Sequence, residues 1–483
     1  MADRVTSVPG VAGESGSPAE HRAAVARLVA SFRAIPPHAP VRLAKRTSNL
    51  FRARERPTAP GLDVSGLAGV LSVDPRGRTA DVAGMCTYER LVDATLPHGM
   101  VPLVVPQLKT ITLGGAVTGL GIESSSFRCG LPHESVLEMD ILTGSGEVVT
   151  ARPDGEHADL FRGFPNSYGS LGYATRLRIE LEPVQAFVAL RHVRFHSVDD
   201  LVAALGAIVD TGHHDGERVD YLDGVVFSAT ESYLCLGAKT DVPGPVSDYT
   251  GQLVYYQSIR HDEPRPRHDR LTTRDYLWRW DTDWFWCSRA FGAQDPRIRQ
   301  LWPRRWRRSS TYWKLVALDQ RFHVAARLDA RRGRPPQERV VQDVEVPLER
   351  CAEFLHWFLR EVPIEPVWLC PLRLREASGE LATATSGDRP WPLYPLRAGQ
   401  TYVNVGFWST VPADPSAPPG EANRLIEAEV TRVHGHKSLY SDAYYDRDEF
   451  DRLYGGETYA ALKRRYDPDR RLLDLYTKAV QRK

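Results

Sequence analysis

The chain has 483 residues, too many for one compact core, so two or more domains are expected. Its formal net charge of +1 provides no basic surface overall, which makes nucleic acid a poor partner. Six cysteines without a CxxC pair predict neither a disulfide framework nor a metal site, and they fit a reducing, cytoplasmic compartment. No apolar run approaches the ~20 residues of a membrane helix, so we expect no membrane span.

The hydrophobic pattern predicts a mixture of helices and strands. Residues 1–20 are rich in glycine, serine and proline, and we expect a disordered lead-in there. Apolar residues at helical spacing predict a helix over 19–35, ended by a proline pair. Short β-like runs separated by turns follow as far as residue 149. The expected strands are 69–73, 79–82 and 136–142, with a hairpin at the turn 143–146, and the expected helix is 89–98.

The pattern changes after Pro183. Mixed strands and helices continue to about residue 430, and a tail rich in tyrosine, histidine and charge becomes helical over 459–465. The pair His213-His214 is expected in a solvated loop. These features indicate an α+β protein with an N-terminal domain of the nucleotide-binding type, a larger middle domain and a tail.

The segment from Thr112 to Ser126 combines four glycines with small apolar residues, an acid and three hydroxyls. Glycine lets another group approach the backbone closely, so the segment suits a cradle for a large polar ligand. Neither GxGxxG nor GK[ST] is present, which excludes the ordinary nucleotide loops. A second pair, Gly169-Ser-Leu-Gly172, adds backbone N–H groups of the kind that bind phosphate. The alternative is a tight turn between strands.

The run 112–126 closely resembles the flavin-binding segment of Δ24-sterol reductases, which have the vanillyl-alcohol-oxidase (PCMH) type of FAD fold. The resemblance extends over roughly residues 41–480. It also rests on the motifs Asp159-Leu-Phe161, Gly169-Ser-Leu-Gly172, Val340-Val-Gln-Asp343, Val367-Trp-Leu-Cys-Pro371 and His434-Gly435. It implies a two-subdomain FAD-binding domain over 21–185 and an α+β substrate or cap domain over 186–430. The C-terminal segment, 431–483, is then expected to pack back near the flavin.

The resemblance implies FAD, and no histidine or cysteine occupies an obvious position for covalent attachment, so the flavin is expected to be non-covalent. The expected contacts are Thr112, Leu113, Gly114, Gly115, Ala116, Gly119, Gly121, Ile122, Ser124, Ser125, Gly169, Ser170 and Gly172. The first pyrophosphate loop of this fold is often rich in glycine, but residues 41–49 contain none. Arg42, Lys45 and Arg46 are candidates to supply charge for phosphate instead, or they form a solvated basic strand edge.

The tail also resembles the closing segment of sugar and alditol oxidases through His434-Gly-His-Lys437 and Tyr466-Asp-Pro468. In those enzymes a lysine lies near the N1/C2 edge of the flavin, where a fixed cation stabilises the negative charge of the reduced ring. Lys437 is the candidate for that role, and an ordinary surface lysine is the alternative.

Reduction of an isolated C=C bond needs a hydride and a proton, and the alkene has no carbonyl that the protein can polarise. A carboxyl kept protonated in an apolar pocket suits the proton donor. The candidates are Glu123, Asp442, Tyr440 and His434. For Glu123, binding of the FAD ribose or capping of a helix is an equal alternative.

Seven of the eleven tryptophans fall between residues 278 and 313, interleaved with arginines. They are Trp278, Trp280, Trp284, Trp286, Trp302, Trp306 and Trp313, among Arg297, Arg299, Arg304, Arg305, Arg307 and Arg308. This composition favours a lipid interface, where tryptophan lies at headgroup depth and arginine pairs with phosphate. A tryptophan-rich core edged by solvated arginines, or a docking face for a protein, are the alternatives.

The expected function is an NAD(P)H-driven, FAD-dependent reduction of an isolated alkene in a large apolar substrate. Heavy use of arginine and alanine is typical of a GC-rich bacterial genome. The resemblance then favours reductases that convert a 10-methylene fatty acyl chain of a phospholipid into the 10-methyl chain. A SAM-dependent methyltransferase partner and peripheral contact with the inner face of an anionic membrane fit this expectation. The alternatives are Δ24-sterol or terpenoid reduction, an alcohol or sugar oxidase, and a non-catalytic partner of a methyltransferase.

Overall fold

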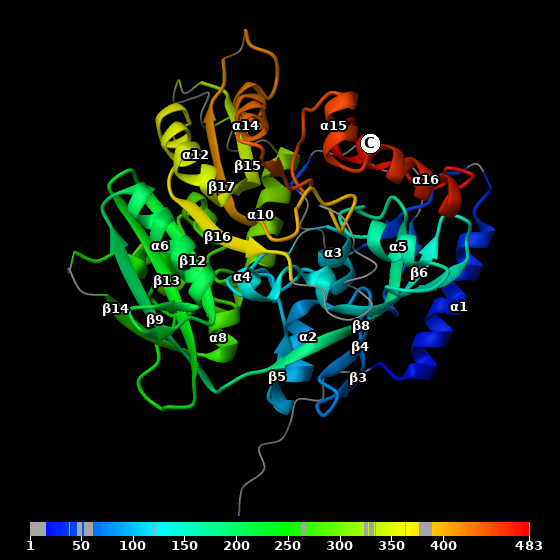
Figure 1. Cartoon of the computed structure of the whole chain (residues 1–483), viewed down its shortest axis with the longest axis horizontal. Helices are drawn as coiled ribbons and strands as arrows, with labels where there is room; N and C mark the ends of the chain where they lie inside the picture. Colours follow the sequence, from blue (N-terminus) through cyan, green and yellow to red (C-terminus); the bar gives the residue numbers. More distant parts are fainter. Residues whose placement is uncertain are drawn as a thin grey trace, which may run out of the picture.

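The computed structural model describes residues 16–37, 39–45, 51–52, 61–119, 121–262, 266–322, 327, 333, 335–362, 364–375, 389–414 and 416–482. Two large antiparallel sheets lie side by side with helices packed around them (Figure 1). This mixture confirms the α+β class. No helix among the described residues is both long enough and apolar enough to cross a membrane.

The smaller of these sheets has six strands in the order β3-β4-β8-β6-β7, with β5 paired to β8. Its strands are β3 (Val70–Asp74), β4 (Thr79–Ala83), β5 (Met100–Pro102), β6 (Val136–Thr143), β7 (Val148–Ala151) and β8 (Gly172–Pro183). The predicted hairpin is confirmed, because β6 and β7 pair antiparallel. Gly146 lies in its turn with a φ of +83°, a conformation that favours glycine.

The larger sheet has eight strands in the order β14-β9-β13-β12-β16-β17-β15-β18. They are β9 (Phe187–Phe195), β12 (Tyr221–Ser228), β13 (Glu231–Thr240), β14 (Arg267–Thr272), β15 (Gln337–Pro347), β16 (Val367–Arg373), β17 (Thr401–Pro412) and β18 (His436–Lys437). The chain passes from one sheet to the other between Pro183 and Phe187. Two small sheets complete the strands: β1 (Leu43–Ala44) with β2 (Leu62–Asp63), and β10 (His213–His214) with β11 (Glu217–Arg218).

The two faces of the larger sheet have different neighbours. Helices α6 (Val198–Thr211), α12 (Leu348–Glu361) and α14 (Glu421–Arg432) pack on one face and share a core with it. Side chains of the opposite face, such as Trp368 and Trp408, belong to a continuous core with the six-stranded sheet and its helices. A site formed by both sheets therefore lies on the face without α6, α12 and α14.

The remaining helices surround these layers. They are α1 (Pro18–Ala34), α2 (Tyr88–Thr95), α3 (Leu113–Thr118), α4 (Ser126–Cys129), α5 (Ala158–Gly163), α7 (Tyr255–Ile259), α8 (Thr273–Leu277), α9 (Pro296–Leu301), α10 (Ser309–Phe322), α15 (Arg447–Leu453), α16 (Gly456–Tyr466) and α17 (Leu475–Ala479), with 3-10 turns η1 (Leu96–His98), η2 (Pro132–Ser135), η3 (Cys287–Phe291) and η4 (Arg304–Trp306). The C-terminal helix α16 packs against α5 of the smaller-sheet half, and α15 packs against α16 (Figure 1).

Three local predictions need correction. The predicted lead-in 1–20 extends too far, because Ser17 and Glu20 form a capping box that starts α1 at Pro18; residues 1–15 lie outside the described residues. The helix predicted over 89–98 changes to a 3-10 turn at Leu96, next to Pro97, which lacks an N–H donor. His213-His214 is a strand of a small hairpin rather than a loop, since both residues pair with β11.

Candidate functional site

The glycine segment forms α3 and packs closely against the protein itself. The side chain of Thr112 caps α3 by accepting a hydrogen bond from the backbone N–H of Gly115. A Cβ on Gly114 would meet the carbonyl oxygen of Gly84 at 2.6 Å, and one on Gly121 would meet Pro132 at 2.6 Å. Glycine is therefore required here for backbone packing, besides any role in a cradle.

The second glycine loop lies beside the end of α3. The backbone N–H of Tyr168 donates to the carbonyl of Thr118 over 2.7 Å, and a Cβ on Gly119 would meet the Tyr168 ring at 3.2 Å. Gly169 and Gly172 have φ values of +72° and +152°, which favour glycine. The two segments that the sequence singled out thus meet in space, although about fifty residues separate them.

The other residues of the run 112–126 that were predicted to contact FAD are buried among, or hydrogen-bonded to, other residues of the protein. Leu113, Ala116 and Ile122 are buried in the core. The hydroxyl of Ser124 hydrogen-bonds that of Tyr276 on α8 over 2.9 Å, and Ser125 donates to the carbonyl of Leu103. These bonds tie the end of the segment to both halves of the molecule.

Glu123 is buried in an ionic network. Its Oε1 lies 3.0 Å from Nη2 of Arg279, which is also 2.9 Å from Asp223 on β12. Burial raises the pKa of Glu123, and the charge of Arg279 partly opposes this shift. The Glu123 side chain is therefore an anchor between the two sheets, and its predicted roles as a proton donor or a ribose ligand stay predictions.

Two carboxyl groups on β15 face the core that both sheets share. Asp343 and Glu345 are two residues apart, so they lie on the same face of the strand. Burial raises the pKa of Asp343 to about 6, although hydrogen bonds from Asn404 and Tyr440 oppose the shift. Burial also raises the pKa of Glu345 well above its ordinary value. Both groups can therefore carry a proton at higher pH than an exposed carboxyl.

An aromatic cluster surrounds Tyr440, next to Asp343. The Trp408 indole donates to the Tyr440 hydroxyl over 2.8 Å. Phe51 lies 5.7 Å from the Tyr440 ring and 4.8 Å from that of Trp313, both measured between ring centroids. Burial raises the pKa of Tyr440 well above 10, so its hydroxyl stays protonated. The cluster presents an apolar wall beside an acid.

His436 lies opposite Glu345 in the same interior. Its Nε2 is 3.4 Å from Oε2 of Glu345, and burial lowers the pKa of His436 to about 3, so the imidazole is neutral. Tyr394 packs edge-on against His436 and stacks on His133 of η2. Burial also lowers the pKa of His133 to about 3. The site thus combines neutral imidazoles with carboxyls whose pKa values are raised by burial.

Lys437 lies on the opposite face of the larger sheet. Its Nζ is 2.8 Å from Oε1 of Glu427 on α14, and it also donates to the carbonyl of Asp442. With 1% exposure, it is not an ordinary surface lysine. Its role beside flavin stays a prediction.

The structure does not bring the other tail candidates together with Tyr440. Asp442 is half-buried, with its Oδ1 3.4 Å from Arg482. His434 is exposed and has a φ of +60°. Tyr440 is thus the one of the four predicted proton donors that lies beside the carboxyls of β15.

The predicted phosphate ligands near the N-terminus flank β1. Arg42 is half-buried and Lys45 is exposed, while Arg46 lies outside the described residues. The backbone carbonyl of Ser170 accepts a hydrogen bond from Lys463 over 2.7 Å. The C-terminal segment therefore places a positive charge beside the second glycine loop. This contact was not predicted from the sequence.

The residues between the sheets fit a large polar ligand such as FAD. Several buried polar atoms of the described residues have no hydrogen-bond partner, which is uncommon in a protein interior. They include Ser167 Oγ, His133 Nε2, both ring nitrogens of His436, and Oε2 of Glu123 and Glu345. A ligand with many donors and acceptors would satisfy such groups.

The tryptophan and arginine segment is mostly internal, so its placement as a whole on a lipid surface is wrong. Trp278, Trp280, Trp284 and Trp286 are buried. Arg299 and Arg307 are buried too, and donate to backbone carbonyls. An exposed part remains at α9 and η4, where Leu301 and Trp306 are 85% and 49% exposed.

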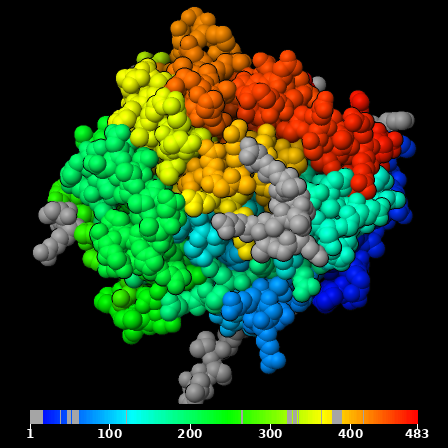
Figure 2. Space-filling view, viewed as in Figure 1, coloured from blue at the N-terminus to red at the C-terminus, as the bar shows by residue number. Residues whose placement is uncertain are grey.

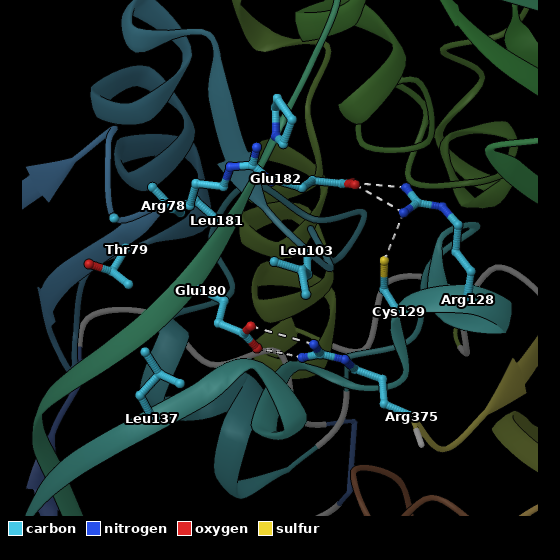
Figure 3. A pocket seen from close by; sticks show the side chains of 12 residues that line it. Arg78, Thr79, Leu103, Arg128, Cys129, Leu137, Glu180, Leu181, Glu182 and Arg375 are labelled. Atoms are coloured by element: carbon cyan, nitrogen blue, oxygen red, sulfur yellow. Dashed lines mark hydrogen bonds and ion pairs between the residues drawn. The ribbon is translucent and has the colours of Figure 1, made fainter. Parts of the chain in front are cut away.

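A separate pocket of about 400 Å³ opens at the end of β8, and the carboxyls of β15 are not among the residues that line it (Figure 3). Arg128 pairs with Glu182 and Arg375 with Glu180 across it. The thiol of Cys129 lies 3.0 Å from Arg128, but burial raises its pKa to about 11, which disfavours a reactive thiolate. Because its charges are already paired, this pocket is not part of the candidate site.

Comparison with known proteins supports FAD binding. Residues 19–152 match the family model of the FAD binding domain. The chain carries an FAD-binding domain. It is 27% identical to the Δ24-sterol reductase of Rattus norvegicus over 413 residues, which cover 82% of this chain and 73% of that protein. For the Δ24-sterol reductase of Arabidopsis thaliana the identity is 26% over 444 residues, covering 86% and 76%.

A shorter similarity links the chain to cytokinin dehydrogenase 5 of Oryza sativa, which is 32% identical over 154 residues, 32% of this chain and 28% of that protein. Together these similarities support an FAD-dependent oxidoreductase that resembles Δ24-sterol reductases.

Several groups of the site were not predicted from the sequence, above all Asp343, Glu345 and His436. A signal was present, because acids alternate with valines in Gln342-Asp-Val-Glu-Val346. In a strand this alternation places both acids on one face. Arg279 and Asp223, which lie beside Glu123 in the structure, carried no such signal in the sequence.

Proposed function

We propose that this protein uses FAD to reduce an isolated C=C bond in a long apolar lipid, with NAD(P)H as the electron donor. The FAD binding domain match and the similarity to Δ24-sterol reductases over most of the chain support this class of reaction. Bound FAD would supply the hydride. The protein must then supply a proton, because an isolated alkene has no carbonyl that would stabilise a carbanion.

The carboxyl of Asp343 carries this proposal. Its pKa of about 6 keeps a useful fraction protonated near neutral pH, and it lies in a buried interior beside aromatic rings. The Tyr440 hydroxyl receives a hydrogen bond from Trp408 and bonds Asp343, so it orients the carboxyl. Asp343 is thus the proposed proton donor, and Tyr440 is a positioning group.

The aromatic cluster suits an apolar substrate. The ring of Phe51 lies 4.8 Å from that of Trp313, 5.6 Å from that of Trp284 and 6.3 Å from that of Trp408, measured between centroids. Their rings exclude water from the acid and contribute dispersion contacts to a hydrocarbon chain. Within this class we propose a 10-methylene fatty acyl chain of a phospholipid as substrate and the 10-methyl chain as product.

The reaction class is tested by anaerobic mixing of the purified flavoprotein with NADPH. Bleaching of the flavin by NADPH, and its return on addition of a methylene lipid, supports the proposal. Reduction only by an alcohol or sugar, with peroxide release in air, contradicts it in favour of an oxidase. A protein that is not reduced by either, but binds a methyltransferase, contradicts it in favour of a non-catalytic partner.

The substrate is tested by mass spectrometry of lipids from cells that express this chain with a SAM-dependent methyltransferase that makes the methylene lipid. Conversion of the methylene lipid into its methyl product requires this chain if the proposal holds. Turnover of Δ24-sterols or terpenoids, with methylene lipid unchanged, supports the same reaction class with a different substrate.

We also propose peripheral contact with an anionic membrane through the exposed part of the tryptophan and arginine segment. Leu301 and Trp306 project from α9 and η4, and Arg304 and Arg305 are exposed beside them. Exposed tryptophan and leucine next to arginine suit a headgroup region. This contact would place the protein beside its lipid substrate.

A further inference from the structure

Two lysines of the C-terminal segment reach three consecutive carbonyls of the second glycine loop. The Lys478 ammonium, on α17, lies 3.1 Å from the carbonyl of Tyr168 and 2.9 Å from that of Gly169. The Lys463 ammonium, on α16, lies 2.7 Å from the carbonyl of Ser170. In the space-filling view this C-terminal segment lies directly against the part of the chain that contains the loop (Figure 2).

The two lysines differ in how their charge is balanced. Lys463 forms an ion pair of 2.5 Å with Asp467. Lys478 forms no ion pair within 4.0 Å with a carboxylate of the described residues. Two neutral carbonyls solvate its ammonium without cancelling the charge.

More positive charge surrounds Lys478. Burial lowers its pKa well below the ordinary value, and the charges of Arg52, Lys463 and Lys45 lower it further, with Asp474 acting in the opposite direction. The guanidinium of Arg52 lies over the Tyr168 ring, 5.2 Å from its centroid. An ammonium held among other cations in a desolvated position is unfavourable unless it loses its proton or an anion binds there.

We propose that Lys478, together with Arg52 and Lys45, binds the diphosphate of FAD. The inference rests on flavin binding by this chain, and not on reduction of an alkene. Lys478 reaches the glycine loop beside α3, where a diphosphate would meet this ammonium together with the charges of Arg52 and Lys45. Helix α17 would thereby add positive charge to that of Lys45, in the segment 41–49 whose sequence contains no glycine.

The test compares two flavins that share the ring system but differ in the diphosphate. Apoprotein is titrated with FAD and with riboflavin, and the fluorescence of the flavin reports each Kd. Lys478→Met should raise the Kd of FAD by about 10-fold to 100-fold, which is the usual range for a lost charge-assisted hydrogen bond. Riboflavin affinity should change by less than about threefold, and Lys478→Arg should restore FAD binding in part.

Lys239→Met is the control, because Lys239 is also a partly buried lysine that donates to a backbone carbonyl, that of Pro183, but its charge is paired with Glu182. It should leave the Kd of FAD unchanged. An unchanged FAD affinity in Lys478→Met, or an equal loss for FAD and riboflavin, overturns the proposal in favour of a purely structural contact.

Thermal unfolding provides a second measurement. The apo form of Lys478→Met should melt at or above the temperature of the apo wild type, because a desolvated charge has been removed, while the stabilisation by added FAD should shrink. A lower apo melting temperature with undiminished stabilisation by FAD contradicts a ligand role. If the methionine variant does not fold, the wild type provides the test. Added salt should weaken the binding of FAD and leave the binding of riboflavin unchanged. An equal dependence of both affinities on salt overturns the proposal.

Discussion

The ammonium of Lys437 lies 2.8 Å from the carboxylate of Glu427, and both side chains are buried between β18 and α14. Lys437 also donates to the carbonyl of Asp442, and the backbone N–H of Tyr444 donates to Glu427. The pair therefore holds the start of the tail against the helix-covered face of the sheet. This is the face opposite the carboxyls of Asp343 and Glu345.

Lys437→Met should destabilise the fold rather than act on the flavin. Removing one partner of a buried ion pair costs about 3–5 kcal/mol, because the other charge is left uncompensated. Denaturant unfolding measures this loss. Arg447→Met, which breaks the exposed pair with Asp451, is the control and should cost less than about 1 kcal/mol. Unchanged stability with an altered flavin spectrum would instead support the role inferred from the oxidase resemblance.

Arg279→Met should be among the most destabilising single changes in the chain. It leaves Glu123 and Asp223 buried without their shared cation, at a cost of about 3–5 kcal/mol. Without Arg279 the pKa of Glu123 rises further, so the variant should regain stability as pH falls and Glu123 becomes neutral. Unfolding curves across pH check the slope. Glu123→Gln should lower the free energy of unfolding by less than Arg279→Met does. Equal losses in the two variants would show that the pairing of Glu123 with Arg279 matters little.

Asp343→Asn should abolish turnover and stabilise the protein near neutral pH. The pKa of Asp343 rises from 3.8 to about 6 in the fold, so the folded state keeps a proton that the unfolded chain has lost. The contribution of Asp343 to the free energy of unfolding therefore decreases as the pH rises from about 4 to about 6, by roughly 3 kcal/mol in total. Asparagine cannot ionise and removes this dependence.

Two measurements check this prediction. The free energy of unfolding is measured across pH for Asp343→Asn and the wild type, and alkene reduction is measured in single turnovers. Turnover of the wild type should decline as pH rises above about 6, because the protonated fraction of Asp343 falls. Asp414→Asn, at an exposed carboxylate, is the control and should change neither quantity. Full activity of Asp343→Asn would exclude Asp343 as the proton donor.

Gly114→Ala and Gly115→Ala should behave differently although the residues are adjacent. The Cβ at 114 would press on the backbone of Gly84, so the fold should lose about 1–3 kcal/mol. The Cβ at 115 meets only the cap hydroxyl of Thr112, and loss of that cap costs about 1 kcal/mol. Flavin content after purification, read beside melting temperature, separates the two effects. Loss of FAD from a stable Gly115→Ala would locate the cradle there.

Charge reversal of Arg304 and Arg305 should weaken binding to anionic vesicles. Each basic residue near such a surface contributes about 1 kcal/mol, so the double glutamate variant should bind at least about tenfold more weakly in flotation assays. The same double change at Arg350 and Arg360 on α12 is the control for net charge. Arg307 is unsuitable for this test because it is buried. Equal vesicle binding of both variants would show that α9 and η4 do not contact lipid.

The sequence by itself determined the local features of this protein. The glycine in the hairpin turn at 146 acts on neighbouring residues, so this turn was readable along the chain. The capping box at Ser17 and the proline at 97 are local signals too, but the two helix boundaries that they set were predicted at other residues. The glycine run from 112 and the pair at 169 and 172 were also visible as special segments, because their conformational needs are local.

Only the tertiary structure decided which distant side chains meet. Arg279 lies 156 residues from Glu123, and Lys478 lies 309 residues from Gly169. Burial, too, is a property of the packed molecule: it placed four tryptophans of the segment 278–313 in the core and raised the pKa of Asp343. Lys437 and His436 are neighbours in the chain yet lie on opposite faces of one sheet, since side chains alternate along a strand. The pairing of β18 with β15 determines which of them faces the carboxyls.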